Sequence, residues 1–467
     1  MHAIKLPTHK TASLYPIIKA PIAKQLYFPI NQQQLLIKPG EYVSKGQCIA
    51  LATNPQDVTI HASSSGIFQG IVTYGEKSCL QIVTDGNDTW CKKQPIQDYQ
   101  QLSPAECLKK ITDAGIIGLG GAGFNTANKI SATHSQKNNS PNLQLIINGV
   151  ECEPYICTDD SLMQHHSEEV IRGIEIVCHI LRINKATLAI ENDKPAALQA
   201  VRAINSLLVD IVAIPTFYPA GSEKQLIATL LNREIPSGLY PSDVGIICLN
   251  VATVAAIYHA IIKDEPLFSR ITTLTGNAVL QPRNVEVLIG TPVADLLALV
   301  EIKNSSALCF SQGGNMMPLQ LTNAHTPILK TSNCILINEE NTVPPNESPC
   351  IRCGACNTVC PAHLLPEQLY WHSKSQHDEK LQQLNLFDCI ECGCCDYVCP
   401  SHIPLTDYYR QAKIRIKQQQ DEKNHADLAK QRFEARETRL SSGNDIASEK
   451  RLAIQQALAR ARQRKEK

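Results

Sequence analysis

Between about Gln32 and Val83, short apolar runs alternate with glycine-containing turns, a pattern typical of small β domains. The expected strands lie at Leu35–Ile37, Cys48–Leu51, Val58–Ile60, Gly66–Phe68 and Cys79–Val83. This pattern predicts a compact β domain over residues 31–95. Residues 1–30 are punctuated by prolines and hold no sustained apolar period, which predicts an irregular N-terminal arm.

From Ser103 onwards, apolar strand patterns alternate with helical ones, which predicts a mostly parallel α/β sheet. The first helix is expected to begin with a capping box at Ser103 and Glu106, with Pro104 at its first position. Strands are expected at Leu143–Asn148, Ala186–Glu191, Ile211–Pro215 and Gly245–Leu249, and helices at Glu168–His179, Pro195–Leu207, Glu223–Leu231 and after Val251. We assign residues 100–265 to this domain. Residues 266–338 are strand-rich again, with one expected helix near Val293–Leu299.

The last part of the chain is polar and rich in Gln, Lys, Glu and Ala, which predicts a long helix over residues 406–467. From Ser401 to Lys467 there are 16 Lys and Arg against 9 Asp and Glu, and the remainder holds 28 against 35, so the formal net charge of +0 hides an asymmetry. A basic helix favours docking onto an acidic partner subunit or a lipid surface. A solvated helix with nothing bound is the open alternative.

With 467 residues the chain is expected to form several domains. Val251–Ile262, its longest apolar candidate, falls well short of the roughly 20 residues that cross a bilayer. The first residues lack the apolar stretch and cleavage site of a secretory signal. We therefore expect a cytoplasmic protein whose contact with a membrane is peripheral.

Nineteen cysteines in a chain with no secretory signal argue against a disulfide framework. Nine of them fall between Cys350 and Cys399, in two copies of the pattern C-x2-C-x2-C-x3-C-P. Nine of the fourteen positions that begin at Cys350 are identical in the copy that begins at Cys389, so the segment is an internal duplication. This spacing is that of bacterial ferredoxins with two 4Fe-4S clusters.

In such a repeat the fourth cysteine of each copy ligates the other cluster. The first cysteine set is then Cys350, Cys353, Cys356 and Cys399, and the second cysteine set is Cys360, Cys389, Cys392 and Cys395. Gly354 and Gly393 allow the backbone to approach the inorganic sulfides. Zinc would need two Cys-x2-Cys pairs in each site, which the spacing disfavours. Cys394 is an extra thiol, for which we expect a role other than ligation.

Two further motifs fall in the α/β domain. Four glycines, at Gly118, Gly120, Gly121 and Gly123, form a backbone that a flat cofactor or a phosphate can approach closely, although a plain loop is the alternative. The spacing fits neither a Walker loop nor a Rossmann turn. Asn148–Pro154 follows the carboxyl end of a strand, where ligands bind in open α/β sheets. Its two carboxylates suit hydrogen bonds to ribose hydroxyls, with an ordinary acidic turn as the alternative.

Together these motifs resemble a known family. Gly118–Phe124 is similar to the flavin- and NADH-binding loop G-x-G-G-x-G-F in the flavoprotein subunit of respiratory complex I, and Asn148–Pro154 is similar to its N-x-x-E-x-E-P element. Tyr218–Leu226 and Leu249–Thr253 resemble later segments of the same site. Lys38–Gln47 resembles the hairpin of biotinyl and lipoyl sandwich domains, without the lysine that carries their cofactor. The order of the modules resembles the C subunit of the Rnf/Rsx ion-translocating oxidoreductases over nearly the whole chain.

The chain departs from the family pattern at two places. Asn125 stands where the family usually has proline, and Gly314–Pro318 replaces a more glycine-rich stretch. Leu119 stands in the glycine loop where complex I has arginine.

The resemblance implies a multidomain α/β and α+β fold. Its modules are a barrel-sandwich hybrid (31–95), a flavin- and NADH-binding domain like that of complex I (100–265), an SLBB-like β-grasp module (266–338), a ferredoxin-like domain with two 4Fe-4S clusters (345–405) and the basic helical tail. It also implies an NADH-linked oxidoreductase subunit of a translocase at the cytoplasmic face of the bacterial inner membrane. NADH would pass electrons through FMN to the clusters and on to integral and peripheral partner subunits. No nucleic-acid partner is expected.

The expected cofactor-binding residues share the glycine loop and the strand ends: Gly118, Gly120, Gly121, Gly123, Lys129, Asn148, Glu151, Glu153, Lys224 and Asn250. Lys129 and Lys224 would offset phosphate charge, while Glu151 and Glu153 would contact the nicotinamide nucleotide or position the flavin. Hydride transfer needs no catalytic acid or base. Two rivals stay open: a soluble flavin and iron–sulfur reductase such as a cobalamin reductase, and an electron-wire subunit with a vestigial flavin site.

Overall fold

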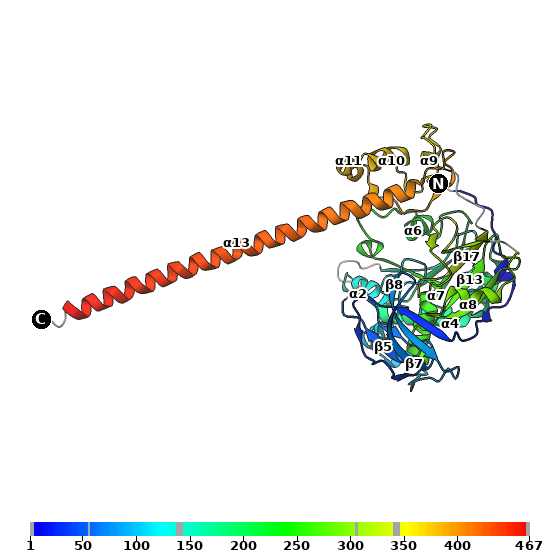
Figure 1. Ribbon diagram of the computed structural model, residues 1–467, viewed down its shortest axis with the longest axis horizontal. Helices are drawn as coiled ribbons and strands as arrows, with labels where there is room; N and C mark the ends of the chain where they lie inside the picture. Colours follow the sequence, from blue (N-terminus) through cyan, green and yellow to red (C-terminus); the bar gives the residue numbers. More distant parts are fainter. Residues whose placement is uncertain (1–3, 55–56, 137–142, 304–306, 340–345, 464–467) are drawn as a thin grey trace. The chain divides into compact units, whose positions relative to one another are not determined.

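A computed structural model describes residues 4–54, 57–136, 143–303, 307–339 and 346–463 of the chain. Two compact units divide it: one holds residues 1–367 and 388–404, and the other holds residues 368–387 and 405–467. The first unit contains three sheet-based modules and both cysteine motifs (Figure 1).

The N-terminal module is built from two small antiparallel sheets that enclose one apolar core. Phe68, Leu80 and Ile82 are fully buried in this core. One sheet has the order β2-β8-β7-β4 and the other the order β3-β5-β6. The strands are β2 (Gln25–Pro29), β3 (Gln34–Leu35), β4 (Tyr42–Val43), β5 (Cys48–Leu51), β6 (Ile60–His61), β7 (Gly66–Tyr74) and β8 (Lys77–Thr84).

The prediction that residues 1–30 are irregular is wrong for two segments. These segments are the strands β1 (Ile18–Lys19) and β2, and a short 3-10 helix, η1 (Thr11–Leu14), precedes both. The strand β2 lies at the edge of the sandwich and pairs with β8, and β1 pairs in parallel with β14 of another module. Strands of two to five residues at sheet edges take their geometry from the neighbouring strand, so the local sequence carries little sign of them.

The α/β domain contains a parallel four-stranded sheet of order β11-β10-β9-β12. Its strands are β9 (Gln144–Gly149), β10 (Ala186–Glu191), β11 (Val209–Ile214) and β12 (Ile246–Asn250). Its helices are α1 (Pro104–Asp113), α2 (Thr126–Gln136), α3 (Thr158–His165), α4 (Ser167–Leu181), α5 (Pro195–Ala203), α6 (Glu223–Leu231) and α7 (Val251–Tyr258), which continues as a π-helical turn, His259–Lys263. The predicted capping box of α1 is present, but α3 was not predicted.

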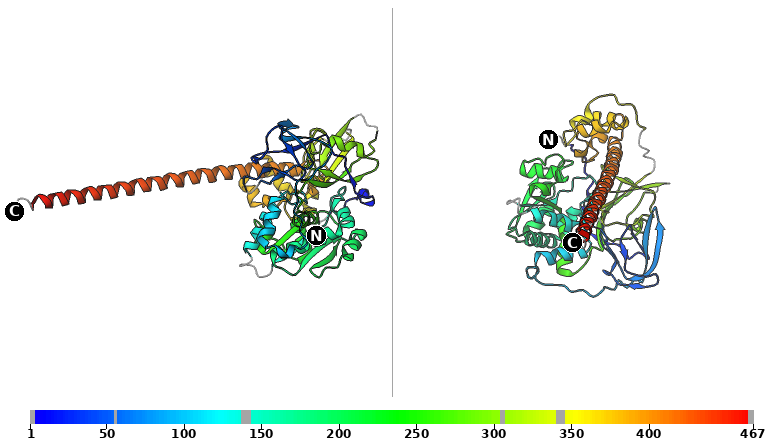
Figure 2. Two further views of the ribbon diagram at one scale, coloured as in Figure 1. Left: turned by 90° about the horizontal axis from the view of Figure 1, so that it is seen from below. Right: turned by 90° about the vertical axis from the view of Figure 1, so that its left-hand side faces the viewer.

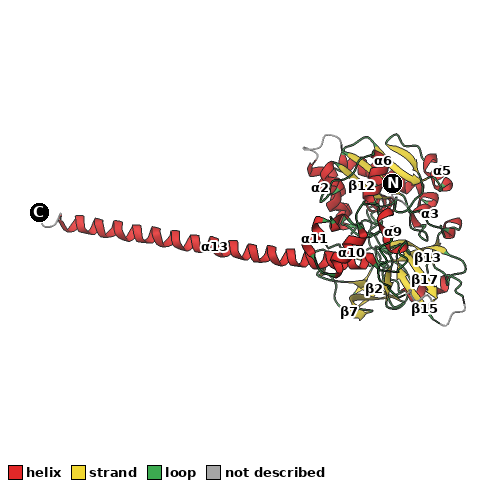
Figure 3. Cartoon of the chain, turned by 90° about the horizontal axis from the view of Figure 1, so that it is seen from above, coloured by secondary structure: helices red, strands yellow, loops and turns green. Residues whose placement is uncertain are grey.

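Successive residues of β9 enter different apolar cores, so helices cover both faces of the sheet. Leu145 and Ile147 lie in a core with Val254 of α7, whereas Ile146 lies in a core with Leu226 of α6. Figure 3 shows the helices of this domain around the strands. The chain runs from β9 outwards through β10 and β11 and then returns to the other side of β9 with β12. The carboxyl ends of β9 and β12 therefore flank the topological switch point.

The third module is a mixed six-stranded sheet of order β1-β14-β13-β17-β15-β16. Val285, Ile335 and Ile337 are fully buried or nearly so in its core. The predicted single helix is present as α8 (Val293–Leu296) followed by a 3-10 turn, Leu297–Leu299. The remaining strands are β13 (Ser269–Thr275), β14 (Arg283–Leu288), β15 (Leu308–Gln312), β16 (Leu319–Leu321) and β17 (Cys334–Glu339).

The two cysteine motifs carry the short helices α9 (Ala355–Thr358) and α12 (Cys394–Tyr397). The second compact unit comprises most of α10 (Pro366–Lys374), α11 (Asp378–Gln383) and the predicted C-terminal helix, α13 (Leu405–Gln463). Figure 2 shows α13 as one continuous helix from two further directions. None of the helices in the described ranges is both long and apolar enough to span a bilayer.

The first turns of α13 carry a buried stripe. Leu405, Tyr409, Ala412 and Ile416 are buried at the spacing of one helix face. Arg415 adds hydrogen bonds from its guanidinium to the carboxylate of Asp378 in α11. From residue 417 to residue 439 every side chain is exposed. This long stretch therefore gains nothing from packing within its own unit, as the sequence predicts for a solvated or partner-bound helix.

Candidate functional site

Two asparagines occupy the carboxyl ends of the strands at the switch point. Asn148 of β9 and Asn250 of β12 are paired residues of neighbouring parallel strands. The Asn148 side chain donates to the carbonyl of Gly221 at 2.9 Å. The Asn250 side chain accepts from the amide of Ala252 at 2.9 Å, which caps α7, and donates to the Asp159 carboxylate at 2.5 Å. Both amides are thus held in fixed orientations at the sheet edge where ligands bind.

The glycine loop is pinned to its surroundings at Leu119. The Leu119 amide donates to the Thr253 hydroxyl at 2.9 Å, and its carbonyl accepts from the Arg270 guanidinium at 2.7 Å. At its base, the Gly118 amide donates to the Phe124 carbonyl at 2.7 Å. The leucine that replaces the arginine of complex I therefore has a structural use, because its apolar side chain is buried in the sandwich core.

The loop lies over β12 and leaves one face open. A Cβ atom placed on Gly120 would lie 3.3 Å from the Cβ of Asn250. Gly121 has a φ of +112°, which side-chain-bearing residues rarely adopt, and a Cβ there would meet nothing within 4 Å. Gly123 also has a positive φ, of +68°. A backbone without side chains, open on one side above a strand's carboxyl end, fits the close approach of a flat cofactor and its phosphate.

The two predicted lysines are each paired with a carboxylate. Lys129 of α2 lies 2.8 Å from Glu223 at the start of α6, and both side chains are about one third exposed. Lys224 lies 3.6 Å from Asp388, which directly precedes the second cysteine motif. Each carboxylate partly neutralises its lysine, so less positive charge is available to bind a phosphate than the sequence alone suggests. Their charge-offsetting role remains a prediction.

Glu151 points inwards to the first turn of α3. Its carboxylate accepts from the Thr158 hydroxyl at 2.9 Å and from the amides of Asp159 at 3.1 Å and Asp160 at 3.4 Å. A carboxylate at a helix N-terminus satisfies amides that lack intrahelical partners and interacts favourably with the helix dipole. Lys10 donates to the carbonyl of Glu151. These contacts favour the positioning role of Glu151 over direct contact with a nucleotide.

Glu153 lies beside the second departure from the family pattern. The amide of Met316 donates to its carboxylate at 3.3 Å. A Cβ on Gly314 would overlap that carboxylate, so the glycine makes room for it. Burial raises the pKa of Glu153 to about 7, against the opposing effect of the hydrogen bond from Met316.

Sequence reasoning missed three residues that organise this region. Asp159 connects Asn250 to the first turn of α3, and burial, together with the nearby Glu151, raises its pKa to about 7. Arg270 is buried and holds the glycine loop. Lys10, from the N-terminal arm, lies 4.0 Å from the buried Glu191. The run Thr158-Asp-Asp-Ser, which contains Asp159, is typical of a helix start. No local pattern marks Arg270 or Lys10.

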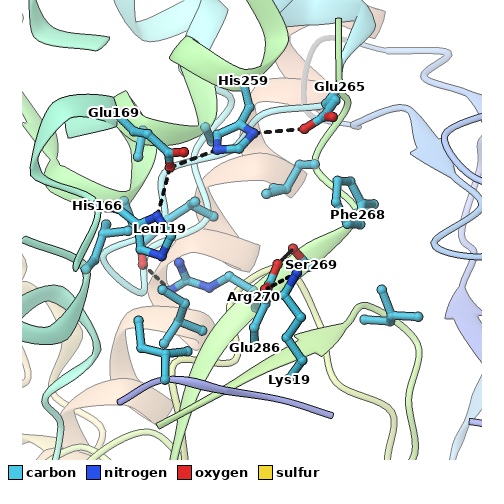
Figure 4. A pocket seen from close by; sticks show the side chains of 18 of the residues that line it. Lys19, Leu119, His166, Glu169, His259, Glu265, Phe268, Ser269, Arg270 and Glu286 are labelled. Carbon is cyan, nitrogen blue, oxygen red and sulfur yellow. Dashed lines mark hydrogen bonds and ion pairs between the residues drawn. The ribbon is translucent and has the colours of Figure 1, made fainter. Parts of the chain in front are cut away.

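A cavity of about 640 Å³ is lined by Ala252, Ala255 and Ala256 of α7 and by His259, which follows them (Figure 4). Its lining includes Leu119 and Arg270, but none of the ten predicted cofactor-binding residues. At one end His259 lies between two carboxylates, 3.0 Å from Glu169 and 2.9 Å from Glu265. Burial disfavours the charged form of His259, whereas the two carboxylates favour it. The pKa of His259 is raised overall, because the combined effect of the carboxylates is the larger one.

The two cysteine motifs have the same backbone conformation. Arg352 and Glu391 occupy equivalent positions with φ of 56° and 55°. Gly354 and Gly393 follow with φ of 75° and 73°, each preceding a short helix. In each copy an amide donates to a cysteine sulfur at 3.4 Å, from Arg352 to Cys350 and from Glu391 to Cys389. The duplication seen in the sequence therefore extends to the loop geometry that places the thiols.

The thiols that influence one another electrostatically fall into two groups, each with members from both motifs. Burial raises the pKa of Cys356 to about 11, and the neighbouring thiols of Cys353 and Cys399 also raise it. Burial likewise raises the pKa of Cys360, and part of the rise comes from Cys392. In both groups, these influences join thiols of one copy to a thiol of the other.

Cys395 completes the second group. Its pKa is raised by burial, by Asp396 and then by Cys389 and Cys392. Cysteine thiolates in this crossed arrangement are the donor set of 4Fe-4S clusters, so the residues present fit that cofactor.

Within the described ranges, no three His, Cys, Asp or Glu side chains converge tightly enough to hold a single metal ion. A four-iron cluster needs a different arrangement, because its thiolates bind separate irons. The extra thiol of Cys394 is fully buried. Its hydrogen bond with the Cys392 thiol and its burial raise its pKa.

Curated relatives match the chain over more than nine tenths of its length. The C subunit of the ion-translocating oxidoreductase complex of Pseudomonas aeruginosa is 42% identical over 93% of this chain and 58% of that protein. The protein of the same name from Yersinia pestis is 43% identical over 92% of this chain and 71% of that protein. The chain belongs to the family of C subunits of ion-translocating oxidoreductase complexes. The family resemblance of the motifs is thereby confirmed.

The chain spans between about three fifths and three quarters of the length of these relatives. Residues 2–86 match the RnfC barrel sandwich hybrid domain, residues 111–259 the Nuo51 FMN-binding domain and residues 349–403 the 4Fe-4S dicluster domain. These matches confirm the sandwich, flavoprotein-like and iron–sulfur parts of the predicted fold, and the FMN and 4Fe-4S types of cofactor. The crystal structure of an NAD+-reducing NiFe-hydrogenase in the H2-reduced state is 17% identical with a TM-score of 0.48, over 67% of this chain and 61% of that one, too weak a similarity to argue from.

Proposed function

We propose that this chain is the peripheral subunit of an ion-translocating complex that takes electrons from NADH and passes them, through FMN and two 4Fe-4S clusters, to membrane-bound partner subunits. One observation carries the proposal. The glycine loop above the switch point and the two cysteine motifs belong to the same compact unit, in which Lys224 of α6 is paired with Asp388, directly before the second motif. A nucleotide site and a pair of one-electron carriers in one folded unit suit a protein that receives hydride and releases single electrons.

Each residue of the loop region has a role in this proposal. The open backbone at Gly121, with Gly118, Gly120 and Gly123, admits the cofactor, and the amides of Asn148 and Asn250 orient it. Lys129 exchanges its pairing with Glu223 for a phosphate, and Lys224 adds positive charge nearby. Glu151 and Glu153 position the loop and the strand end. FMN supplies the exchange between a two-electron hydride and single electrons.

In the cluster segment, the first cysteine set holds one 4Fe-4S cluster and the second cysteine set holds the other. Cys394 fills a buried gap next to the second set and is not a ligand. We further assign the sheet of residues 266–338 to an SLBB-like β-grasp module, because a single short helix accompanies its mixed strands.

The subunit lies on the cytoplasmic face of the inner membrane. Its partners are integral and other peripheral subunits, and it binds no nucleic acid. The basic helical tail, whose side chains are exposed from residue 417 to residue 439, docks onto an acidic subunit or lipid surface.

Anaerobic purification of the chain followed by iron, sulfide and flavin analysis tests this function. We expect about eight iron atoms per chain from two four-iron clusters, together with bound FMN. Co-purification with integral membrane proteins separates the complex from a soluble reductase of similar architecture. Clusters without any flavin, even after FMN is added, would make the chain an electron wire whose flavin site is vestigial.

A further inference from the structure

The α/β domain contacts the second cysteine motif through a buried tyrosine. Tyr218 is 3% exposed, and its hydroxyl donates to the backbone carbonyl of Cys392 at 2.7 Å. Three residues further along the same segment, the carbonyl of Gly221 accepts from the side chain of Asn148. A short connected path therefore leads from the strand end at the switch point to a residue of the second cysteine set.

Two more contacts join the same partners. The side chain of Gln225 donates to the carbonyl of Pro361 at 2.9 Å, and Pro361 directly follows Cys360. Lys224 is paired with Asp388, which directly precedes Cys389. Both contacts fall next to members of the second cysteine set, one in each motif.

Apolar packing closes this junction. Tyr218, Met316, Cys392 and Cys394 form one buried cluster, and Cys152 packs against it. A Cβ on Gly393 would overlap the carbonyl of Met316, so the second motif lies directly against this loop.

The first cysteine set is more exposed. Cys353 is exposed, and the neighbouring Ile351 is 68% exposed. By contrast, Cys360, Cys392 and Cys395 of the second set are all at most 9% exposed. Electron transfer to another protein requires a carrier near the surface, because the rate falls steeply with distance.

We propose that Tyr218 is a positioning residue that holds the second cysteine set against the flavin-type domain, so that this set receives electrons first and the first set, around Cys353, delivers them to the partner protein. The inference rests on the proposed function. Each step moves one electron. The second-set cluster is reduced as its donor loses one electron, and it is reoxidised as the first-set cluster is reduced. Because one NADH supplies two electrons, the second-set cluster is reduced and reoxidised twice for each hydride.

Ligand variants of the full-length chain test the order. In Cys353→Ser, rapid-freeze EPR after mixing with NADH should still show the second-set cluster reduced within one turnover, while transfer to the membrane partner is lost. In Cys389→Ser, NADH should reduce neither cluster rapidly, although dithionite still reduces the remaining one. Rapid NADH reduction of the first-set cluster in Cys389→Ser would overturn the proposed order.

Tyr218→Phe tests the positioning role without removing a ligand. It keeps the ring but removes the hydroxyl that donates beside Cys392, so the second-set cluster should shift to a lower reduction potential while the first-set potential is unchanged. Reduction of the clusters by NADH should slow at least tenfold, with iron content unaltered. Tyr42→Phe controls for the loss of a tyrosine hydroxyl elsewhere, because it removes a hydrogen bond to Asp85 at an exposed position of the sandwich module. Unchanged potentials and rates in Tyr218→Phe would refute the role.

The two levels of the proposal fail in different ways. If NADH does not reduce the flavin of the wild-type chain, the proposed function fails before any order can be read. If NADH reduces the flavin normally but the first-set cluster receives the electron first, the function stands and the inferred order is wrong.

Discussion

Gly121 offers the sharpest perturbation of the flavin-type site. Its φ of +112° is unfavourable for any residue with a Cβ, and nothing in the protein lies within 4 Å of the position that a Cβ would take. Gly121→Val should therefore cost only backbone strain in the cofactor-free chain, about 1–3 kcal/mol of the free energy of unfolding. The valine side chain, however, projects into the open face where we place the cofactor.

A side chain that projects into space filled by a bound cofactor costs a further amount of about 1–3 kcal/mol, which corresponds to roughly five- to 150-fold weaker FMN binding. Fluorescence titration with FMN and NADH oxidation with an artificial acceptor measure this loss. Dithionite-reduced EPR spectra should show both clusters intact.

Gly238→Val is the matched control. Gly238 lies in the same domain with a φ of +78°, and a Cβ at this position would also meet nothing within 4 Å. The control should lose similar stability but keep FMN binding and NADH oxidation. If Gly121→Val binds FMN as tightly as Gly238→Val does, the assignment of this loop is wrong.

Three further predictions concern other parts of the molecule. Because the folded-state pKa of Glu153 is raised to about 7, the folded chain binds its proton more tightly than the unfolded chain, and stability should fall as pH rises from the unfolded value near 4.5 to about 7. Glu153→Gln should flatten this fall in thermal unfolding measured across that range. Cys360→Ser should damage the second-set cluster and Cys394→Ser neither, as EPR and iron analysis would report; loss of the other cluster in the first variant, or of any cluster in the second, would contradict the crossed assignment. Truncation after Asp421 should leave both clusters intact and weaken association with the membrane complex, and undiminished sedimentation with membranes would show that the folded domains do the docking.

Much of the architecture was predictable, because its signals are local. Strand β10 and helix α6 have the expected bounds. The first is a continuous apolar run and the second an amphipathic run between turn residues, and each pattern is typical of one kind of element. The capping box at Ser103 and Glu106 fixed the start of α1. The cysteine spacing alone predicts two crossed sets.

Other features depend on contacts between distant segments. The pairing of β1 with β14 and the contact of Lys10 with Glu151 join residues more than a hundred positions apart, and short arm sequences carry no sign of them. Glu151 was expected to contact the nucleotide or to position the flavin, because ligands bind after the ends of strands. The local sequence carries no sign that its carboxylate lies against α3, a helix whose largely buried polar first turn hides the usual amphipathic pattern.

The measurement closest to the central claim is an anaerobic titration of the full-length chain with NADH, followed by flavin absorbance and cluster EPR. Complete reduction should consume about two equivalents of NADH, since FMN accepts two electrons and each cluster accepts one. Bleaching of the flavin should accompany the appearance of both cluster signals. If dithionite reduces both clusters but NADH leaves the flavin and the clusters oxidised, the chain does not accept electrons from NADH and the proposed function is wrong.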